Sequence, residues 1–492
     1  MKNRRSWLRA LFLGVIISSG CAINPVSGRP ELILLSTRGE QQLGEAQSKE
    51  VESAIGLVEN EQLASWVNAI GQRLAKHSPR HDVGYQFQVV DSAEPNAFAL
   101  PGGYVYVTRG LLTLVNSEDE LAGVIAHEIG HVAARHSAQQ VTRAAPFAIL
   151  TNVGAAVTSI ASPSLGRAVG GVGGLAAGIM LAPFSRDQER EADRVGQELS
   201  AAAGWDPAAL PTILGSLERQ QALAGNGGAG FLASHPSTPE RVAATTAYAA
   251  QLQRTPGDPI LGTRAGVLSR LDGLVVGPAA AQGVAAGPTF MHPDLGFFAR
   301  FPESYDVTPS HRITLGAAKD DSGAILLAVV GEGEDPMDGP RALDQKSGTK
   351  IAESARPVNV PGHKAVGVRA RMQTDSGEVV VAFAWIAHAG HIHQALGVAP
   401  IARAEAFLTA YDAFLESFRA LTTAERAAIR EEHLRVVPAL KDETLGAFTA
   451  RSKTPWKLER VALINEVRED ALLSAGQLLK VSLPEPYASR AR

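Results

Sequence analysis

The chain has 492 residues, 45% of them hydrophobic and 20% charged, a composition ordinary for globular proteins that excludes a wholly disordered chain. The formal net charge is −4, whereas nucleic-acid-binding proteins carry an excess of basic residues. The charge therefore excludes that class. The length suggests about three domains. The only cysteine is Cys21, so no internal disulfide can form and stability must come from packed cores.

Residues 1–20 predict an export signal. Basic residues precede a short apolar run, Leu11 to Ile17, and small residues follow it directly before Cys21. The run is too short to form a stable membrane anchor. A cysteine in this place resembles a bacterial lipoprotein signal, although Ser18 stands where leucine is usual. We expect a lipid anchor at Cys21, with a plain secretory signal as the alternative. The general and the twin-arginine export routes both stay open.

The next elements alternate between helical and extended patterns. Residues 38–76 predict amphipathic helix, and two strands, residues 85–90 and Tyr104–Thr108, flank a turn-rich segment over 96–103. Ser117 and Glu120 have the spacing of a capping box, which predicts a helix from there to about His136.

A segment of unusual composition follows over residues 144–184. It is rich in glycine and alanine, and Arg167 is its only charged residue. Glycines, Pro163 and Asn152 interrupt the apolar pattern. This interruption favours a mobile hairpin that covers the cleft, and the alternative is a membrane-inserted segment. A second helix then begins near Ser185 or Asp187 and ends at Gly204, and helical patterns continue to about residue 253.

The C-terminal part changes character. Residues 273–288 have linker composition and predict a domain boundary, so the preceding unit runs from 21 to 272. Residues 289–420 predict an α+β domain of unknown role, with one amphipathic helix over 402–418. Its expected strands cover 297–302, 325–330, 365–371 and 379–386. A connector over 421–433 leads to a last small unit over 434–482.

The motif that carries chemistry is His127-Glu128-Ile129-Gly130-His131, an H-E-x-x-H pattern inside the helix that Ser117 opens. Histidines four apart share one helical face, so both imidazoles can reach one Zn²⁺. The glutamate between them is placed to take a proton from water at the metal. Two surface histidines would be the alternative, but the apolar neighbours predict a buried helix, where both rings need a partner.

A third protein ligand is expected from the second helix. Glu189 and Asp193 are four apart and share a face, whereas Glu191 points roughly the opposite way. Of two carboxylates on one face, one can bind the metal while the other lies behind the ligands and hydrogen-bonds to one of them. The alternative is a solvated charged helix, which the arginines at 186, 190 and 194 keep open.

HEIGH followed by an E-x-E-A-D segment resembles the gluzincin zinc metallopeptidases of family forty-eight, which include the CAAX prenyl proteases, HtpX and the periplasmic BepA and LoiP type. Further matches cover residues 21–255: CAINPVSGR at 21–29, NAFALPGG at 96–103, GWDP at 204–207 and SHPSTPER at 234–241. The start of the mature chain is similar to the lipoprotein branch. The resemblance implies an α+β multidomain protein whose protease core is mainly helical with a small sheet.

The resemblance also implies roles. His127, His131 and Glu189 would bind one Zn²⁺ per chain, Glu128 would be the general base, and Asp193 would lie behind the ligands or donate a proton. His235 would lie near the metal, where it either fills the fourth position and keeps the enzyme latent or stabilises the oxyanion; we favour latency. The glycines between 225 and 230 would give its loop hinge-like freedom.

Other features carry weaker hypotheses. Tyr104–Thr108 would be an edge strand that pairs with an extended substrate. His136, nine positions after His127, is interpreted as a surface residue on the opposite helical face. His388, His391 and His393 lie in an expected hairpin and suggest a second metal site, but no nearby cysteine or carboxylate completes the set of ligands.

The last unit resembles a LysM module with strands near 434–437 and 476–481 and with Asn465 in its usual place. Lys441 and Glu443 depart from the usual pattern and put sugar binding in doubt. A plain structural βααβ unit is the alternative.

Together these features predict a zinc metalloendopeptidase in the bacterial periplasm, lipid-anchored to the outer membrane. Its substrates would be misfolded or misassembled envelope proteins, with the membrane and peptidoglycan as further partners and no role for nucleic acid. The alternative is a chaperone-like or peptidoglycan-associated scaffold lipoprotein with a latent zinc site.

Overall fold

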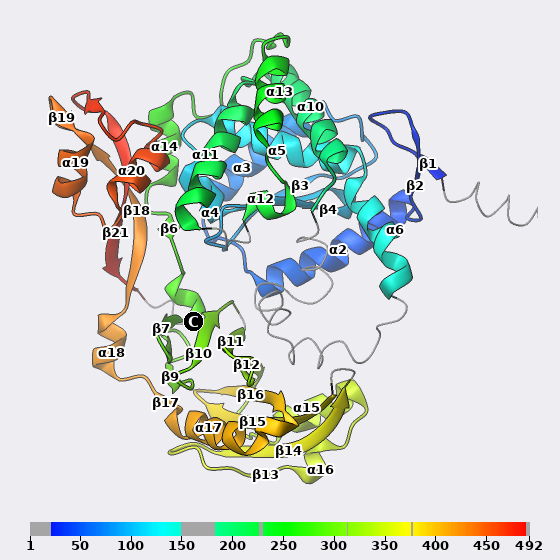
Figure 1. Ribbon diagram of the computed structural model, residues 1–492, viewed down its shortest axis with the longest axis vertical. Coiled ribbons are helices and arrows are strands. Elements are labelled where there is room, and N and C mark those ends of the chain that lie inside the picture. The colour runs from blue at the N-terminus through cyan, green and yellow to red at the C-terminus, as the bar shows by residue number, and fades with distance from the viewer. Residues whose placement is uncertain (1–20, 149–182, 226–229, 312, 375–376, 489–492) are drawn as a thin grey trace, which may run out of the picture.

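The computed structural model describes residues 21–148, 183–225, 230–311, 313–374 and 377–488. The expected signal, nearly all of the glycine- and alanine-rich segment and the glycines at 227 and 228 lie outside these ranges. Figure 1 shows a helical region that carries the HExxH helix and, apart from it, a sheet-rich region, so the molecule is an α+β protein. Within the described ranges no helix is both long and apolar enough to cross a membrane.

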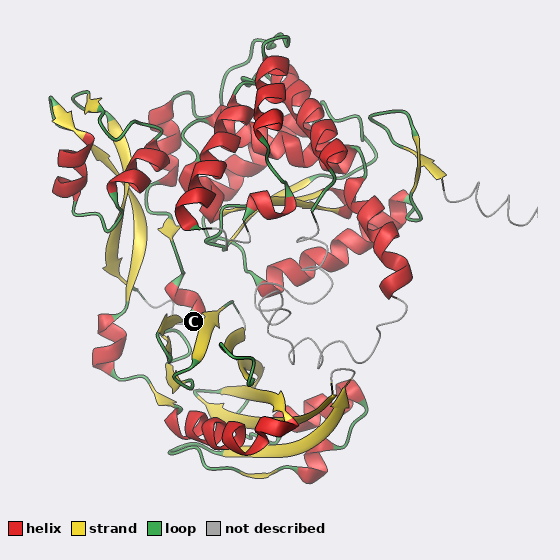
Figure 2. Ribbon diagram, viewed as in Figure 1, coloured by secondary structure: helices red, strands yellow, loops and turns green. Residues whose placement is uncertain are grey.

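The helical region surrounds a small sheet (Figure 2). Its helices are α2 (Thr37–Ala54), α3 (Glu61–Ala75), α4 (Arg109–Leu114), α5 (Glu118–Ala133), α6 (His136–Ala148), α10 (Arg186–Ala203), α11 (Ala209–Ala224), α12 (Phe231–Ser234), α13 (Pro239–Ala249) and α14 (Arg264–Leu271). Its strands are β1 (Cys21–Ile23), β2 (Pro30–Leu32), β3 (Gln86–Val90), β4 (Ala97–Leu100) and β5 (Tyr104–Thr108). The two strands and the HExxH and second helices expected from the sequence are therefore present, and α10 ends at Gly204 as predicted.

The small sheet corrects one expectation. Its strand order is β3-β5-β4, so Tyr104–Thr108 is the central strand and has no free edge for a substrate. β5 pairs in parallel with β3 and antiparallel with β4. Alternation and β-branching identify a strand without fixing its place in the sheet. The two outer edges of the sheet belong to β3 and β4, and β4 contacts α5.

Helix α5 begins as the sequence predicts and ends earlier. Ser117 accepts a hydrogen bond from the backbone N–H of Glu120, and the carboxylate of Glu120 reaches back to the N–H of Asn116. The helix ends at Ala133, and Arg135 has a φ of 61°, a left-handed conformation. The chain therefore changes direction before His136, where α6 begins.

The sheet-rich region has its own hydrophobic core, built from residues between Phe290 and Phe418. A seven-stranded sheet has the order β10-β11-β12-β16-β15-β14-β13, and β7, β8, β9 and β17 form a second sheet. The strands are β7 (Val284–Ala286), β8 (Thr289–His292), β9 (Phe297–Arg300), β10 (Tyr305–Pro309), β11 (Ile313–Ala318), β12 (Ala324–Glu332), β13 (Arg356–Pro357), β14 (Ala365–Thr374), β15 (Gly377–His388), β16 (His391–Pro400) and β17 (Arg419–Ala420). The helices are α15 (Asp338–Ser347), α16 (Ile351–Ser354) and α17 (Ala404–Ser417).

The C-terminal unit has two consecutive helices between two long strands, with a short strand before and after the helix pair, and it lies beside the helical region (Figure 1). Its elements are α18 (Thr423–Ala428), β18 (Arg430–Pro438), β19 (Glu443–Thr444), α19 (Leu445–Ser452), α20 (Leu458–Asn465), β20 (Leu472–Leu473) and β21 (Leu478–Pro486). Its buried residues, from Leu434 to Val481, belong to the same hydrophobic core as the helical region. The expected linker, residues 273–288, contains two strands. β6 (Val275–Val276) pairs with β18, and β7 pairs with β8, so this segment belongs to two sheets.

Candidate metal centre

The centre forms where α10 crosses α5. Gly130, inside the HExxH motif, and Gly196 allow the close approach, because a Cβ on either would lie 2.8 Å from the backbone of the opposite helix. This crossing places Glu189 of α10 against His127 and His131 of α5. His235 enters from the end of α12 and is also buried.

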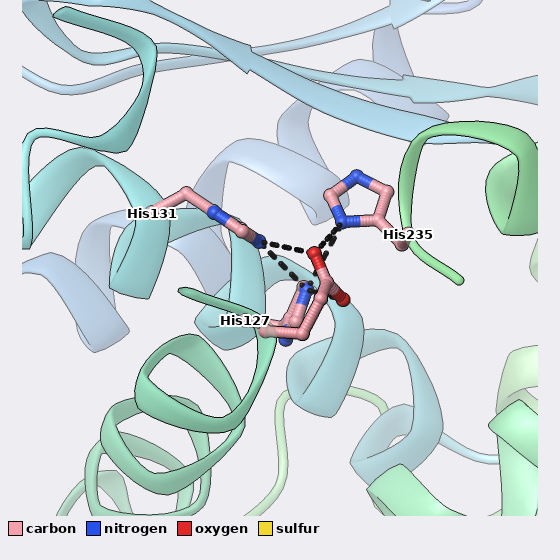
Figure 3. A group of neighbouring side chains, drawn as sticks. His127, His131 and His235 are labelled. Atoms are coloured by element: carbon pink, nitrogen blue, oxygen red, sulfur yellow. Dashed lines mark hydrogen bonds and ion pairs between the residues drawn. The ribbon is translucent and has the colours of Figure 1, made fainter. Parts of the chain in front are cut away.

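The four side chains offer donor atoms that converge (Figure 3). Nε2 of His127 lies 3.0 Å from Nε2 of His131 and 3.3 Å from Nδ1 of His235. Oε1 of Glu189 lies 3.3 Å from Nε2 of His131 and 3.0 Å from Nδ1 of His235. Zinc bonds of about 2.0–2.1 Å in a tetrahedron place neighbouring ligand atoms ~3.3 Å apart. Imidazole nitrogens and a carboxylate oxygen at these separations therefore fit zinc.

Burial and charge prepare these groups to bind a cation. Burial lowers the pKa of His131 well below its usual value, which keeps the ring neutral and its lone pair available. Burial alone would raise the pKa of Glu189, but His235 and His131 outweigh it and hold that pKa well below the usual value. Neutral His131 and ionised Glu189 are thus in the forms in which these side chains bind metals, whereas Glu189 and Glu128 raise the pKa of His235 despite its burial.

Glu128 faces the same space. Its side chain is fully buried, and neither carboxylate oxygen has a hydrogen-bond partner among the described residues. Oε1 lies 3.5 Å from Nε2 of His235. Burial raises the pKa of Glu128, although His235 and His127 lower it in part. A buried carboxylate without a hydrogen bond is costly, which is typical of a group kept for chemistry.

Asp193 and Arg241 lie behind the donor atoms. Oδ1 of Asp193 is 2.9 Å from Nδ1 of His127. Arg241 donates from Nε and Nη2 to this carboxylate at 2.6 and 2.8 Å, and its Nη1 lies 2.6 Å from Oε2 of Glu189. Burial opposes ionisation of Asp193, but Arg241 and His127 outweigh it and lower its pKa. Arg241 thus holds the ligand Glu189 and also Asp193, which orients the ligand His127.

His136 is a correction to the sequence interpretation. It is fully buried, and its Nδ1 lies 2.9 Å from Nδ1 of His131. Its Nε2 lies 3.1 Å from Oε2 of Glu191. The surface prediction assumed one straight helix through residue 136, whereas the chain turns at Arg135 and brings the ring back to the site. The early end of α5 had no clear sequence signal.

The structure thus brings together every sequence-predicted site residue: His127, Glu128, His131, Glu189, Asp193 and His235. Sequence reasoning missed Arg241 and His136. Arg241 lies in the SHPSTPER segment, and the need of two buried carboxylates for a cation was the available signal.

The histidines of the β15–β16 hairpin do not form a second centre. Within the described ranges, the one group of three or more converging ligands is that of His127, His131, Glu189 and His235. The hairpin itself is present, with His388 opposite His391.

Comparisons with known proteins agree with this geometry. Residues 61–249 match the family model described as peptidase family M48. The chain is 32% identical over 214 residues to the "Beta-barrel assembly-enhancing protease" of Escherichia coli, covering 42% of this chain and 43% of that protein. It is 33% identical over 223 residues to the "Mitochondrial metalloendopeptidase OMA1" of Schizosaccharomyces pombe, covering 44% and 63%.

A third relative is the "Mitochondrial metalloendopeptidase OMA1" of Arabidopsis thaliana, 39% identical over 163 residues, with 33% of this chain and 31% of that protein covered. The matches thus cover less than two thirds of each relative's length. Residues 61–249 thus resemble an M48 metallopeptidase domain, and the buried His-His-Glu-His cluster, whose donor set fits zinc, lies within that range.

Proposed function

We propose that the chain is a zinc metalloendopeptidase that hydrolyses peptide bonds in misfolded or misassembled cell-envelope proteins. The observation that carries the proposal is Glu128, a buried carboxylate that has no hydrogen-bond partner in the described part of the chain and lies beside four converging metal ligands. The relative named as a β-barrel assembly-enhancing protease supports envelope proteins as the substrate class.

Each residue of the site has a separate role in peptide hydrolysis. His127, His131 and Glu189 would hold zinc, which supplies Lewis acidity for water and for a peptide carbonyl. Glu128 accepts a proton from the attacking water and passes it to the leaving amine. Its raised pKa brings it nearer the neutral range in which a carboxyl can both accept and return a proton. Asp193 orients His127, and its lowered pKa favours this role over that of a proton donor.

We propose that His235 keeps the resting enzyme latent. Its Nδ1 lies within 3.0–3.3 Å of Glu189 and His127, the same spacing that relates the other donor atoms. A zinc site with four protein ligands is closed, whereas a catalytic site keeps one position open. The same observation favours the second candidate function, a chaperone-like scaffold with a latent zinc site. Intact Glu128 favours the enzyme.

We further propose that the protein is a periplasmic lipoprotein anchored to the outer membrane through Cys21. The lone cysteine after the small residues of the signal supports this proposal. Cys21→Ser should release the mature protein from membranes on carbonate extraction, whereas the unchanged chain should stay bound. Retention of the Cys21→Ser variant would contradict lipid anchoring.

We also propose that residues 434–482 form a LysM-like unit that associates with peptidoglycan. Its βααβ order supports this proposal. Purified peptidoglycan should retain the chain in sedimentation. Recovery of all the protein in the supernatant would assign the unit a structural role only.

The substrate class is tested with an outer-membrane β-barrel precursor, either unfolded or folded into vesicles. We expect the wild-type chain to cleave the unfolded form faster, because an extended peptide can reach a buried zinc site and a folded barrel cannot. Equal cleavage of both forms would contradict the quality-control role while leaving proteolysis intact. Binding of the unfolded precursor without cleavage by both the wild-type chain and His235→Ala would favour the scaffold.

A further inference from the structure

The side chain of His131 is held from behind by residues that lie far away in the sequence. Its Nε2 faces the donor cluster, and its Nδ1 faces Nδ1 of His136 at 2.9 Å. Nε2 of His136 reaches Oε2 of Glu191 at 3.1 Å. The same carboxylate oxygen accepts a hydrogen bond from Nδ2 of Asn24, also at 3.1 Å. A continuous chain of contacts thus joins the first residues of the described chain to a metal ligand.

We propose that Asn24, Glu191 and His136 are positioning residues for zinc, and that the β1–β2 hairpin completes the metal centre by fixing the orientation of His131. The proposal rests on zinc binding at the cluster and adds to the proposed function a requirement for the N-terminal segment.

The hydrogen-bond chemistry permits one consistent arrangement. A ligand that uses Nε2 must carry its proton on Nδ1, so His131 donates to Nδ1 of His136. His136 then accepts at Nδ1 and carries its own proton on Nε2, which donates to Glu191. The carboxylate ends the chain, because an ionised carboxylate only accepts. A metal-bound histidine commonly donates to a carboxylate, which fixes the orientation and the tautomer of its ring. Here His136 lies between the metal-binding His131 and the carboxylate of Glu191.

Asn24 is placed to hold this carboxylate. Its side chain is fully buried, and its Oδ1 accepts from the backbone N–H groups of Val26 and Ser27 at 2.8 and 3.2 Å. The Nδ2 group donates to Glu31 at 3.1 Å as well as to Glu191. All four hydrogen-bonding positions of this amide are occupied, so its orientation is fixed from both ends.

The hairpin is also fastened to the helices around the centre. Gln139 of α6 donates to Glu31 and accepts from Gln188 of α10 at 2.9 Å. The backbone N–H of Leu34 donates to Thr142. Figure 1 shows β1 and β2 close to α6 and α10. The segment that follows Cys21 thus bridges the two helices that carry His136 and Glu191.

The test measures zinc affinity by competition with a chromogenic chelator. Glu191→Gln and His136→Ala should raise the zinc Kd about 10–100-fold, the effect typical of residues behind metal ligands. Asn24→Ala should raise it by a smaller factor. Glu198→Gln is the matched control, because Glu198 lies on the same helix and is hydrogen-bonded to Tyr248 on its exposed side.

Thermal unfolding with and without zinc separates positioning from a structural role. A positioning role predicts that the increase in Tm caused by zinc shrinks in Asn24→Ala and Glu191→Gln. A zinc Kd equal to that of the control in both variants, or a Tm loss that is the same with and without zinc, would overturn the proposal. Neither measurement uses a substrate, so failure of the proposed proteolytic function would not be mistaken for failure of this inference.

Discussion

Nδ1 of His235 lies 3.0 Å from Oε1 of Glu189, which places the ring in the ligand set of the metal. Pro236 follows directly and disfavours a helical backbone at His235, and the φ of −120° and ψ of 76° of His235 lie outside the helical region. Opening the fourth ligand position therefore requires the segment around His235 to move.

We predict that His235→Ala raises basal proteolysis of casein, because a water can then occupy the fourth position. The neighbouring Ser237→Ala, which removes only a contact to Glu218, serves as the control. A role in stabilising the oxyanion predicts the opposite sign, a loss of about 10²–10³-fold. A clear loss of activity in His235→Ala would reject latency.

Arg241→Met should strongly destabilise the chain. The change removes the cation that holds two buried carboxylates, those of Asp193 and Glu189. Breaking a buried ion pair costs about 3–5 kcal/mol in the free energy of unfolding. Urea unfolding in the presence of zinc measures this difference.

The matched control is Arg190→Met, because Arg190 is about half exposed and pairs with Asp187 and Glu240 at the surface. Such pairs contribute ~1 kcal/mol or less. Equal losses in the two variants would mean that Arg241 has no special role.

Lys480→Met should loosen the C-terminal unit. The buried Nζ donates to the backbone carbonyls of Thr113 and Val115 at 2.9 and 2.7 Å, just before the residue that caps α5. Each carbonyl left without a partner costs about 1–3 kcal/mol. Limited proteolysis within 421–433 should accelerate, whereas exposed Lys457→Met should leave it unchanged. Unchanged cleavage in Lys480→Met would show that this contact does not hold the unit.

The sheet-rich region should lose stability in acid. Burial, and then the neighbouring His388, His391 and His292, lowers the pKa of His393 to about 3. The unfolded state therefore binds more protons below pH 6.5, and stability falls by up to about 1.4 kcal/mol per pH unit down to pH ~3. Burial lowers the pKa of His292 to about 4 and adds to this slope.

His393→Phe should flatten the dependence of stability on pH between pH 7 and 5, because it removes the buried titrating group. The change costs no hydrogen bond, since neither ring nitrogen has a hydrogen-bond partner among the residues that the structure describes. Phe297 and Phe418 contact the ring and would pack against the substitute. Hydrogen exchange in β15 and β16, corrected for intrinsic pH effects, measures the stability of the region at each pH. His391→Gln is the control. An unchanged slope in His393→Phe would contradict the assignment.

Local signals in the sequence predicted the elements that carry the centre. Ser117 and Ser185 cap α5 and α10, and Gly204 ends α10 with a φ of 90°. Helical spacing alone then places His127 with His131 and Glu189 with Asp193. These features depend on neighbours within a few residues, which a single sequence records.

The errors concern contacts between distant segments. The burial of His136 depends on a left-handed Arg135, a conformation that arginine rarely adopts. The central place of Tyr104–Thr108 depends on pairing with both β3 and β4. The shared core between the helical region and residues 434–481 depends on packing that no local pattern encodes. The contacts of Asn24 and Arg241 likewise join segments that are distant in the sequence.

The most direct test of the account replaces Glu128 by Gln, which keeps the size of the side chain but removes its capacity to accept a proton. The measurement is casein cleavage together with zinc content, in the wild-type chain and in the His235→Ala background, with His131→Ala as the variant that should lose metal. We predict about one zinc per Glu128→Gln chain, a Tm no lower than that of the parent chain and no proteolysis in either background. Cleavage at the parental rate by zinc-loaded Glu128→Gln would contradict the account.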